Sequence, residues 1–281
     1  MSRAAAFFDL DKTVIAKSST LAFGRPFFHG GLINRRAVLK TAYAQFVFSL
    51  AGADAQQMER LRAQLTAMVT GWDAATVHEI VRETLHEIVD PLVYAEAADL
   101  IEEHRAAGRE IVIVSSSGAE MVEPIGEMLG VDRVVATRMV TEDGRYTGEI
   151  DFYAYGENKA EAMRQVAAEG GYDLADCYAY SDSITDLPML AAVGHPTAVN
   201  PDRGLRKAAL QHGWPVRRFE RPVRLRARFS VPPTPVVTGA AMGVGAAVVG
   251  LAWYARHRAV RAGLVAPDPA PVAGRWRRRG A

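Results

Sequence analysis

Four short polar segments carry the residues that could do chemistry. The first spans residues 9–13 and reads DLDKT, so Asp9 and Asp11 are spaced i, i+2 and could both approach one ligand. One carboxylate can act as a covalent nucleophile while a second carboxylate shuttles protons. Taken alone, the segment is as typical of an acidic loop that caps the next helix.

The other three segments are less specific when each is taken alone. Ser115–Gly118 offers hydroxyls and successive backbone N–H groups to a phosphate, but it also fits a strand-to-helix turn with a serine N-cap. Lys159 begins an expected helix and by itself would be an ordinary surface lysine. In the segment 181–186, Asp182 and Asp186 could supply hard oxygen ligands to Mg²⁺, or an aspartate could cap a turn.

The elements that must position these residues follow an α/β pattern. Five short apolar runs are expected to be buried strands of a parallel sheet, with helical segments between the later ones. The DLDKT segment directly follows the first run, and open α/β sheets place ligand sites at the carboxyl ends of their strands. The expected strands are Ala4–Phe8, Ile111–Val114, Val134–Ala136, Cys177–Tyr180 and Thr197–Val199.

Helices and one hairpin complete this pattern. The segment Thr141–Ile150 carries Asp143-Gly144, which is a hairpin turn signal. The expected helices are Leu92–Ala107, closed by Gly108, and Glu157–Glu169, which ends at Gly170.

Residues 17–91 interrupt the alternation of strands and helices and are expected to form an all-helical insertion. Asp54 and Asp73 suit N-caps, and Pro91 ends the series. The expected helices are Ile33–Leu50, Asp54–Thr70 and Asp73–Val89.

Composition and charge limit the class of protein. The chain has 281 residues, of which 49% are hydrophobic and 23% charged, and this excludes a collagen-like, disulfide-scaffold or wholly disordered chain. Cys177 is the single cysteine, so no intrachain disulfide can form, which fits a reducing compartment. The N-terminus does not resemble a secretory signal, because only the short run Ala4–Phe8 precedes Asp9.

The net charge of +1 is unevenly distributed. Residues 217–281 carry thirteen arginines against Glu220 and Asp268, a net charge of +11, which leaves −10 for residues 1–216. A basic tail favours an anionic partner, either lipid headgroups or nucleic acid. Of these two, a membrane surface is expected and a nucleic acid is not.

The C-terminal region has the organisation of a membrane anchor. An Arg/Pro-rich linker is expected at 220–235, a transmembrane helix at 236–255 and a basic, disordered tail at 256–281. About 20 residues span the ~30 Å apolar core of a bilayer. The alternatives are a shallow interfacial helix, a buried helix or a Gly/Ala linker. Gly239 and Gly243 form a G-x-x-x-G pair that could pack two such helices into a homodimer.

Together, the four polar segments resemble the motifs of the haloacid dehalogenase-like (HAD) phosphatase superfamily over roughly residues 4–216. Three further stretches resemble subfamily IB, the phosphoserine-phosphatase-like group: SSSGAEMVEPIGEMLGVDRVVAT at 115–137, TGEID at 147–151 and YSDSITDLPML at 180–190. The resemblance implies a HAD-like (Rossmannoid) parallel sheet with helices on both faces. This core would comprise residues 1–16 and 92–219, with residues 17–91 as an all-helical cap inserted after the first strand.

The resemblance also implies catalytic roles. Asp9 would be the nucleophile that forms an aspartyl-phosphate, and Asp11 would protonate the leaving oxygen and then activate water. Ser115, Ser116 and Lys159 would bind the phosphoryl oxygens. Fixed positive charge of this kind is what phosphoryl transfer needs, since a dianionic phosphate is otherwise repelled by the aspartates.

A Mg²⁺ ion is the implied cofactor. Asp9, the backbone carbonyl of Asp11 and Asp182 would bind it, while Asp186 would either ligate it through water or orient the other ligands. The metal and Lys159 together would offset the repulsion between the carboxylates and the substrate.

Two departures from the group bear on the substrate. Phosphoserine phosphatases carry a glutamate nine residues after the nucleophile, for the substrate's ammonium, and an S-G-G second motif, whereas this chain has Ser18 and S-S-S. Phosphoserine is therefore not expected to be the preferred substrate. His29, Arg35 and Arg36 of the insertion could meet an anionic substrate, or could be solvated residues at the start of a helix.

The function expected from these observations is Mg²⁺-dependent hydrolysis of a small phosphorylated metabolite by a catalytic domain on the cytoplasmic side of a membrane. The alternatives are a membrane-anchored lipid-phosphate phosphatase and a non-enzymatic, membrane-docked binding protein.

Overall fold

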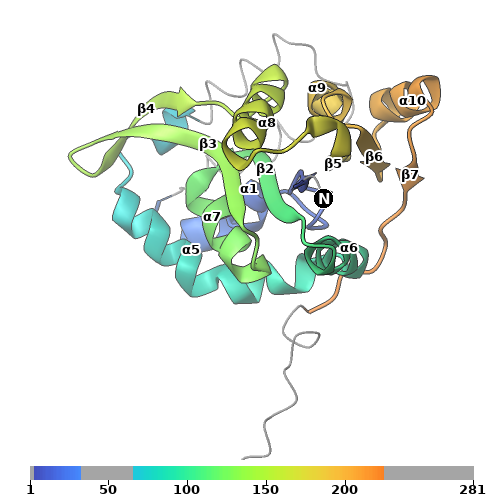
Figure 1. Ribbon diagram of the computed structural model, residues 1–281. Helices are drawn as coiled ribbons and strands as arrows, with labels where there is room; N and C mark the ends of the chain where they lie inside the picture. Colours follow the sequence, from blue (N-terminus) through green and yellow to red (C-terminus); the bar gives the residue numbers. More distant parts are fainter. Residues whose placement is uncertain (1–2, 33–65, 225–281) are drawn as a thin grey trace, which may run out of the picture. The chain divides into compact units, whose positions relative to one another are not determined.

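The computed structural model describes residues 3–32 and 66–224, in which seven strands form one sheet (Figure 1). The strand order is β4-β3-β2-β1-β5-β6-β7, and neighbours run parallel except β3 and β4. This confirms the predicted α/β class. The strands are β1 (Ala5–Phe8), β2 (Glu110–Gly118), β3 (Arg133–Glu142), β4 (Arg145–Phe152), β5 (Tyr178–Ser181), β6 (His195–Val199) and β7 (Val216–Arg217).

The five predicted strands are all present, and the predicted hairpin over 141–150 is confirmed by the end of β3 and by β4, while the structure adds β7. The predicted third strand stops too early, because its apolar run ends at Ala136 while β3 continues to Glu142. The residues beyond Ala136 are held by pairing with β4 rather than by a continuous apolar run. Asp143 and Gly144 join the two strands with φ angles of 48° and 76°, the left-handed conformation that a tight hairpin turn requires.

Helices cover both faces of the sheet. Ala6 and Phe8 of β1 pack with α5, α6 and α7, whereas Ala5 and Phe7 pack on the other side with α8, α9 and α10. This alternation is the two-residue period of a strand buried on both faces. The helices are α1 (Ser19–Ala22), α2 (Gly24–His29), α5 (Ala74–Ile88), α6 (Ala95–Ala106), α7 (Ala119–Leu129), α8 (Glu157–Gly170), α9 (Leu187–Ala191) and α10 (Arg203–His212), with short 3₁₀ turns η1 (Asp90–Leu92), η2 (Leu174–Asp176) and η3 (Ile184–Asp186).

The insertion after β1 is described only at its two ends. The predicted helix 73–89 is present as α5, and Asp73 caps it by accepting a hydrogen bond from the Thr76 N–H at 2.8 Å. The predicted helix 33–50, most of the predicted helix 54–70, and Arg35, Arg36 and Asp54 lie outside the described residues. The structure adds α1 and α2, which are too short to give a periodic apolar pattern.

The hairpin of β3 and β4 is hydrogen bonded to this insertion. Gly71 N–H donates to the Tyr146 carbonyl at 2.7 Å, and Tyr146 N–H donates to the Trp72 carbonyl at 3.0 Å. Ala74 N–H donates to the Gly144 carbonyl at 2.9 Å. Residues 71–74, which lead into α5, are therefore fixed to the hairpin by backbone hydrogen bonds.

The chain from Phe219 to Val223 runs beside the start of α6. Ala95 N–H donates to the Arg221 carbonyl and Val223 N–H donates to the Val93 carbonyl, both at 2.8 Å. Phe219 is buried, and its N–H donates to Asn200 Oδ1 at 3.0 Å. The first residues of the expected linker 220–235 are thus hydrogen bonded to the core.

The expected membrane segment 236–255 and tail 256–281 lie outside the described residues. Within residues 3–32 and 66–224, no helix has the length and apolar character needed to span a bilayer.

Candidate active site

Asp9 lies directly after β1, at the carboxyl end of the central strand of the sheet. Its N–H donates to the Tyr180 carbonyl at 2.9 Å, which continues the pairing of β1 with β5. The residue is only 6% exposed. Burial raises the pKa of Asp9 to about 7, against the opposing effect of Lys159.

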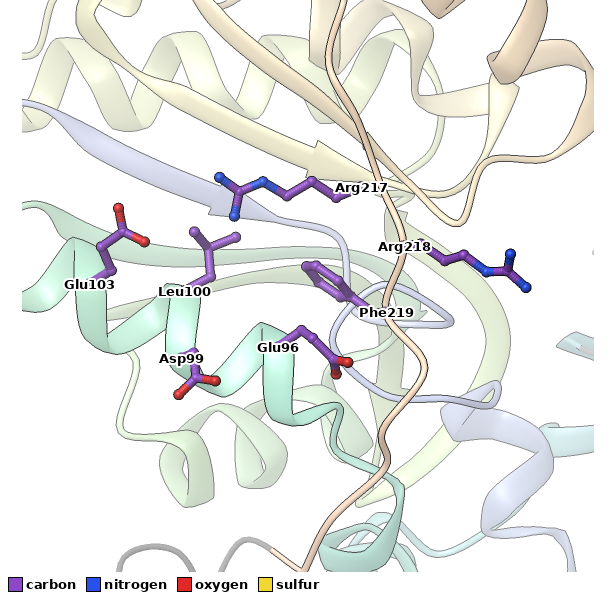
Figure 2. Close-up of a pocket in the computed structure, with 7 residues that line it drawn as sticks. All are labelled: Glu96, Asp99, Leu100, Glu103, Arg217, Arg218 and Phe219. Carbon is purple, nitrogen blue, oxygen red and sulfur yellow. The ribbon is translucent and has the colours of Figure 1, made fainter.

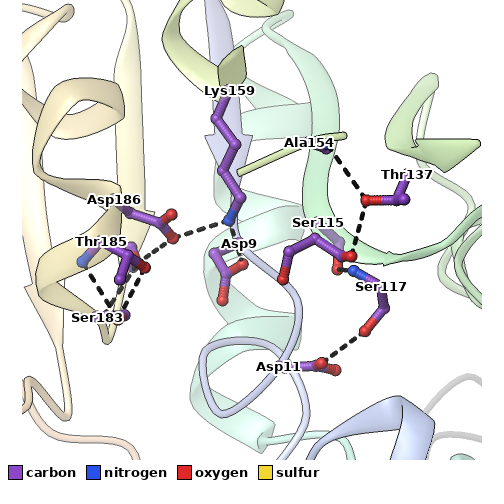
Figure 3. Close-up of polar contacts among 12 residues, drawn as sticks. Asp9, Asp11, Ser115, Ser117, Thr137, Ala154, Lys159, Ser183, Thr185 and Asp186 are labelled. Atoms are coloured by element: carbon purple, nitrogen blue, oxygen red, sulfur yellow. Dashed lines mark hydrogen bonds and ion pairs between the residues drawn. The ribbon is translucent and has the colours of Figure 1, made fainter. Parts of the chain in front are cut away.

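Lys159 joins the first and fourth polar segments. It comes from the first turn of α8, is 2% exposed, and donates to Asp9 Oδ1 at 2.7 Å and to Asp186 Oδ2 at 2.8 Å (Figure 3). Ser181 also donates to Asp186 Oδ2, at 2.7 Å. Burial would lower the pKa of Lys159, but the carboxylates of Asp186 and Asp9 outweigh it and raise that pKa above its ordinary value.

Asp182 adds a further carboxylate beside this group. Burial, and then the negative charge of Asp9, raise the pKa of Asp182 to about 8. Asp9, Asp182 and Asp186 thus lie near the buried ammonium of Lys159, with Lys12 as a further, exposed cation. The donor set is hard oxygen with excess negative charge, which fits a bound Mg²⁺.

The hydrogen bonds of the carboxylates indicate which of them would hold such an ion. Among the described residues, no three His, Cys, Asp or Glu side chains are grouped as metal ligands. Both hydrogen bonds of Asp186 described above go to Lys159 and Ser181, which favours the orienting role for this residue. Asp9 and Asp182 remain as the side chains suited to the ion.

Asp11 lies on the tight loop that follows Asp9. Val14 N–H and Ile15 N–H both donate to the Leu10 carbonyl, at 2.9 and 3.0 Å, and Lys12 takes a φ of 62° within the turn. Asp11 Oδ1 accepts from the Ser19 N–H and Oδ2 accepts from the Ser117 hydroxyl, both at 2.8 Å. The loop therefore presents Asp11 to the first helix of the insertion and to the end of β2.

The serines of the second segment have different environments. Ser115 is buried, and its hydroxyl accepts from the Ser117 N–H at 3.2 Å. Ser116 is exposed, and its carbonyl accepts from the Thr137 hydroxyl at 2.8 Å. In Figure 3, Asp9 lies below the Lys159 ammonium, with Asp186 on one side and Ser115 and Ser117 on the other. These residues lie in the strand itself, because β2 continues to Gly118.

The structure thus gathers Asp9, Lys159, Asp182 and Asp186 on one side and Asp11 with the serines on the other. It does not bring His29 into these contacts, since that residue is exposed at the end of α2 with its ring against Phe28. Three contributing residues were not singled out from the sequence: Ser19, Ser117 and Ser181. The last two lie inside the predicted segments, but no sequence signal marks Ser19.

A separate cavity lies between α6 and residues 217–219, and it contains none of these side chains (Figure 2). Acidic groups from α6 face two arginines across an apolar floor. The lining residues are Glu96, Asp99, Leu100, Glu103, Arg217, Arg218 and Phe219.

Comparison with known proteins identifies similar sequences. Residues 6–191 match the profile of the haloacid dehalogenase-like hydrolase family. The Streptomyces azureus "Inhibition of morphological differentiation protein" is 65% identical over 92% of this chain and 95% of its own length. A phosphoserine phosphatase of Mycobacterium tuberculosis is 34% identical over 92% of this chain and 82% of its own. A histidinol-phosphatase of Neisseria meningitidis is 32% identical over 76% and 98%.

A solved structure is similar over most of the chain. It is a protein of unknown function from Bordetella pertussis, with a TM-score of 0.67 and 28% identity over 77% of this chain and 99% of that one.

Proposed function

The chain belongs to the haloacid dehalogenase-like hydrolase family and is a phosphatase, and from this premise we propose that it hydrolyses small phosphorylated metabolites with Mg²⁺ through an aspartyl-phosphate on Asp9. The observation that carries the proposal is the buried carboxylate of Asp9 at the end of β1, with the Lys159 ammonium on one of its oxygens. The other oxygen is then left to attack phosphorus.

The first step forms a bond between an Asp9 oxygen and the phosphorus of the substrate, while the bond from phosphorus to the leaving oxygen breaks. Asp11 gives a proton to that oxygen, so the product leaves as an alcohol. Lys159 neutralises charge on the transferred group, and Ser115 together with the backbone near Ser116 supplies hydrogen bonds to it.

The second step returns the enzyme to its starting state. Asp11, now a carboxylate, takes a proton from water, whose oxygen attacks phosphorus. The bond between Asp9 and phosphorus breaks and inorganic phosphate leaves. Asp9 and Asp182, with the Asp11 backbone carbonyl, are suited to hold Mg²⁺, which would supply charge neutralisation when bound.

Two features of the chain bear on the identity of the substrate. Ser18, half-buried at the N-cap of α1, supplies no carboxylate for a substrate ammonium, which argues against phosphoserine as the preferred ester. A lipid phosphate is the second candidate, favoured by the +11 charge of residues 217–281 and the uncharged run within them. Because the chain is a phosphatase, the non-enzymatic alternative falls away.

We also propose that residues 236–255 anchor the protein to a membrane, with the catalytic domain on the cytoplasmic side. The test compares the full chain with a shortened chain ending at Arg224, which keeps the hydrogen bonds of Arg221 and Val223 to the core. We expect the full chain to sediment with anionic vesicles and the shortened chain to stay in solution. Equal solubility of both without detergent would contradict the anchor.

The same two chains test the substrate class. Each is assayed against a panel of soluble phosphomonoesters and against phosphatidate in mixed micelles. Faster turnover of soluble esters by both chains supports the metabolite. A preference for phosphatidate that is lost in the shortened chain would instead support a lipid phosphate as the substrate class.

A further inference from the structure

The Asp11 carboxylate is held at both of its oxygens by two serines from different parts of the chain. Ser117 comes from the end of β2 and Ser19 from the first helix of the insertion. We propose that Ser117, supported by Ser19, is a positioning residue that fixes the orientation of the Asp11 carboxylate toward the leaving oxygen of the substrate. This inference rests on the proposed function, because it assigns Asp11 as the acid and base.

A bulge at the end of β2 turns Ser117 toward Asp11. Ser115 pairs with Ala136 and Gly118 pairs with Thr137, so two residues of β2 have no paired position in β3. Ser116 is exposed, whereas Ser117 is 7% exposed and its hydroxyl lies 2.8 Å from Asp11 Oδ2 (Figure 3). The position of this hydroxyl therefore depends on the strand and not on a loose loop.

The insertion holds the same hydroxyl from the other side. Ser19 is fully buried and its hydroxyl donates to Ser117 Oγ at 2.9 Å, while its N–H donates to Asp11 Oδ1 at 2.8 Å. The Thr20 hydroxyl lies 3.4 Å from the same Ser117 oxygen. A chain of hydroxyls thus runs from the insertion through Ser117 to Asp11.

Each contact restrains one oxygen of Asp11. A backbone N–H can only donate, and the Ser19 N–H is fixed where α1 begins, so it holds Oδ1 in place. The Ser117 hydroxyl donates to Oδ2 and is itself held by the hydrogen bond that it accepts from Ser19 Oγ. Together the two contacts fix the plane of the carboxylate, and with it the direction in which Asp11 can reach a leaving oxygen.

Ser117 supplies a contact that glycine could not make. The phosphoserine-phosphatase-like pattern has glycine at this position of its second motif, and glycine has no hydroxyl to orient Asp11. In this chain the serine adds a restraint that couples the acid to the helix on which the insertion begins.

The test uses two aryl phosphates whose leaving groups differ in their need for a proton. Phenyl phosphate needs protonation of its leaving oxygen, whereas 4-nitrophenyl phosphate has a far better leaving group. We expect Ser117→Ala in the full chain to lower kcat/KM for phenyl phosphate about 10-fold, part of the roughly 10²–10⁴ that acid–base catalysis supplies. For 4-nitrophenyl phosphate the expected loss is less than about 2-fold.

Ser19→Ala provides a second, milder variant. It should lower kcat/KM for phenyl phosphate about 3-fold, and Ser19→Ala with Ser117→Ala should be no slower than Ser117→Ala alone, because both act through one hydroxyl. Thr141→Ala is the control, since it removes an exposed hydroxyl of β3 outside the candidate site. It should leave both substrates unchanged.

Equal losses for the two substrates in Ser117→Ala and Ser19→Ala would overturn the inference, because a general loss of structure is not selective for the leaving group. Unchanged kinetics in both variants would also overturn it. If the unaltered chain hydrolyses neither ester with Mg²⁺ present, the proposed function itself is wrong.

Discussion

Lys159 Nζ lies 2.7 Å from Asp9 Oδ1, although the two residues are 150 positions apart in the chain. Both side chains are almost completely buried, so each charge depends on the other and on Asp186. Removing one partner of a buried pair leaves an uncompensated charge, which costs more than an exposed pair would. The contact also puts a fixed cation where the phosphoryl group of a substrate would meet Asp9.

Replacing Lys159 tests this cation. We expect Lys159→Ala to lower kcat about 10²–10³-fold, because a fixed charge in the site is lost from the transition state. Raising the Mg²⁺ concentration should not restore the rate. Arg164→Ala, on an exposed face of the same helix, is the control and should keep normal activity. Steady-state kinetics across a series of Mg²⁺ concentrations measure both variants. Full recovery of the Lys159→Ala rate at high Mg²⁺ would contradict the role given to Lys159.

Replacing Asp182 tests the metal site. Asp182→Ala should reduce kcat about 10²-fold at low Mg²⁺ and recover in part when Mg²⁺ is raised, because a lost ligand weakens binding of the ion without removing the phosphate-binding cation. A rate for Asp182→Ala that stays constant across the same Mg²⁺ series would count against this role.

The raised pKa of Asp182 predicts how stability changes with pH in the absence of divalent metal. The folded-state pKa is about 8 and the ordinary value is 3.8, so between these values the folded protein holds a proton that the unfolded chain has released. The contribution of protonated Asp182 to the free energy of unfolding is fully present below about pH 4 and is lost as the pH rises through about 8. Asp182→Asn cannot ionise and should escape this loss.

The measurement is thermal unfolding in EDTA at pH 5 and pH 9. At pH 9 the Tm of Asp182→Asn should exceed that of the unaltered chain by about 5 °C, as expected from ~2 kcal/mol in a domain of this size. The difference should shrink at pH 5. Asp143→Asn, in the exposed β3–β4 turn, is the control and should match the unaltered chain at both pH values. A lower Tm for Asp182→Asn at pH 9 would refute the prediction.

Substrate preference provides a further prediction. Without a carboxylate at position 18, kcat/KM for phosphoserine should lie at least about 10-fold below that of the best soluble phosphomonoester, and Ser18→Glu should raise the phosphoserine value selectively. An assay of the unaltered chain and of Ser18→Glu against a panel of soluble phosphomonoesters measures this preference. Phosphoserine as the best substrate of the unaltered chain would overturn the prediction.

Much of the fold follows from local sequence patterns. The apolar runs at β1, β2 and β5 predict buried strands because both faces of the sheet are covered, and Asp73 and the Asp143-Gly144 turn act through contacts within a few residues. Strands without a long apolar run were missed or cut short. β7 has two exposed residues, and the second half of β3 is held by its partner strand.

The candidate site was predictable only in part, because its contacts span distant segments. The order of the motifs locates Asp9, Lys159 and Asp182 at the ends of strands and helices. It does not reveal that Ser117 turns inward at a bulge, or that Ser19 supplies both an N–H and a hydroxyl to the Asp11 network. Such contacts depend on how the insertion packs against β2, which no pattern within one segment encodes.

The covalent intermediate on Asp9 is the central claim, and reduction by borohydride tests it most directly. Full-length protein is quenched during turnover of its best substrate with Mg²⁺, treated with borohydride and digested, and the peptide that contains Asp9 is analysed by mass spectrometry. An acyl-phosphate at Asp9 is reduced to the alcohol, so we predict that the side chain of residue 9 is reduced and that Asp11 is unmodified. Asp9→Asn should show neither reduction nor turnover. Normal turnover by Asp9→Asn, or reduction at Asp11 in place of Asp9, would contradict the account.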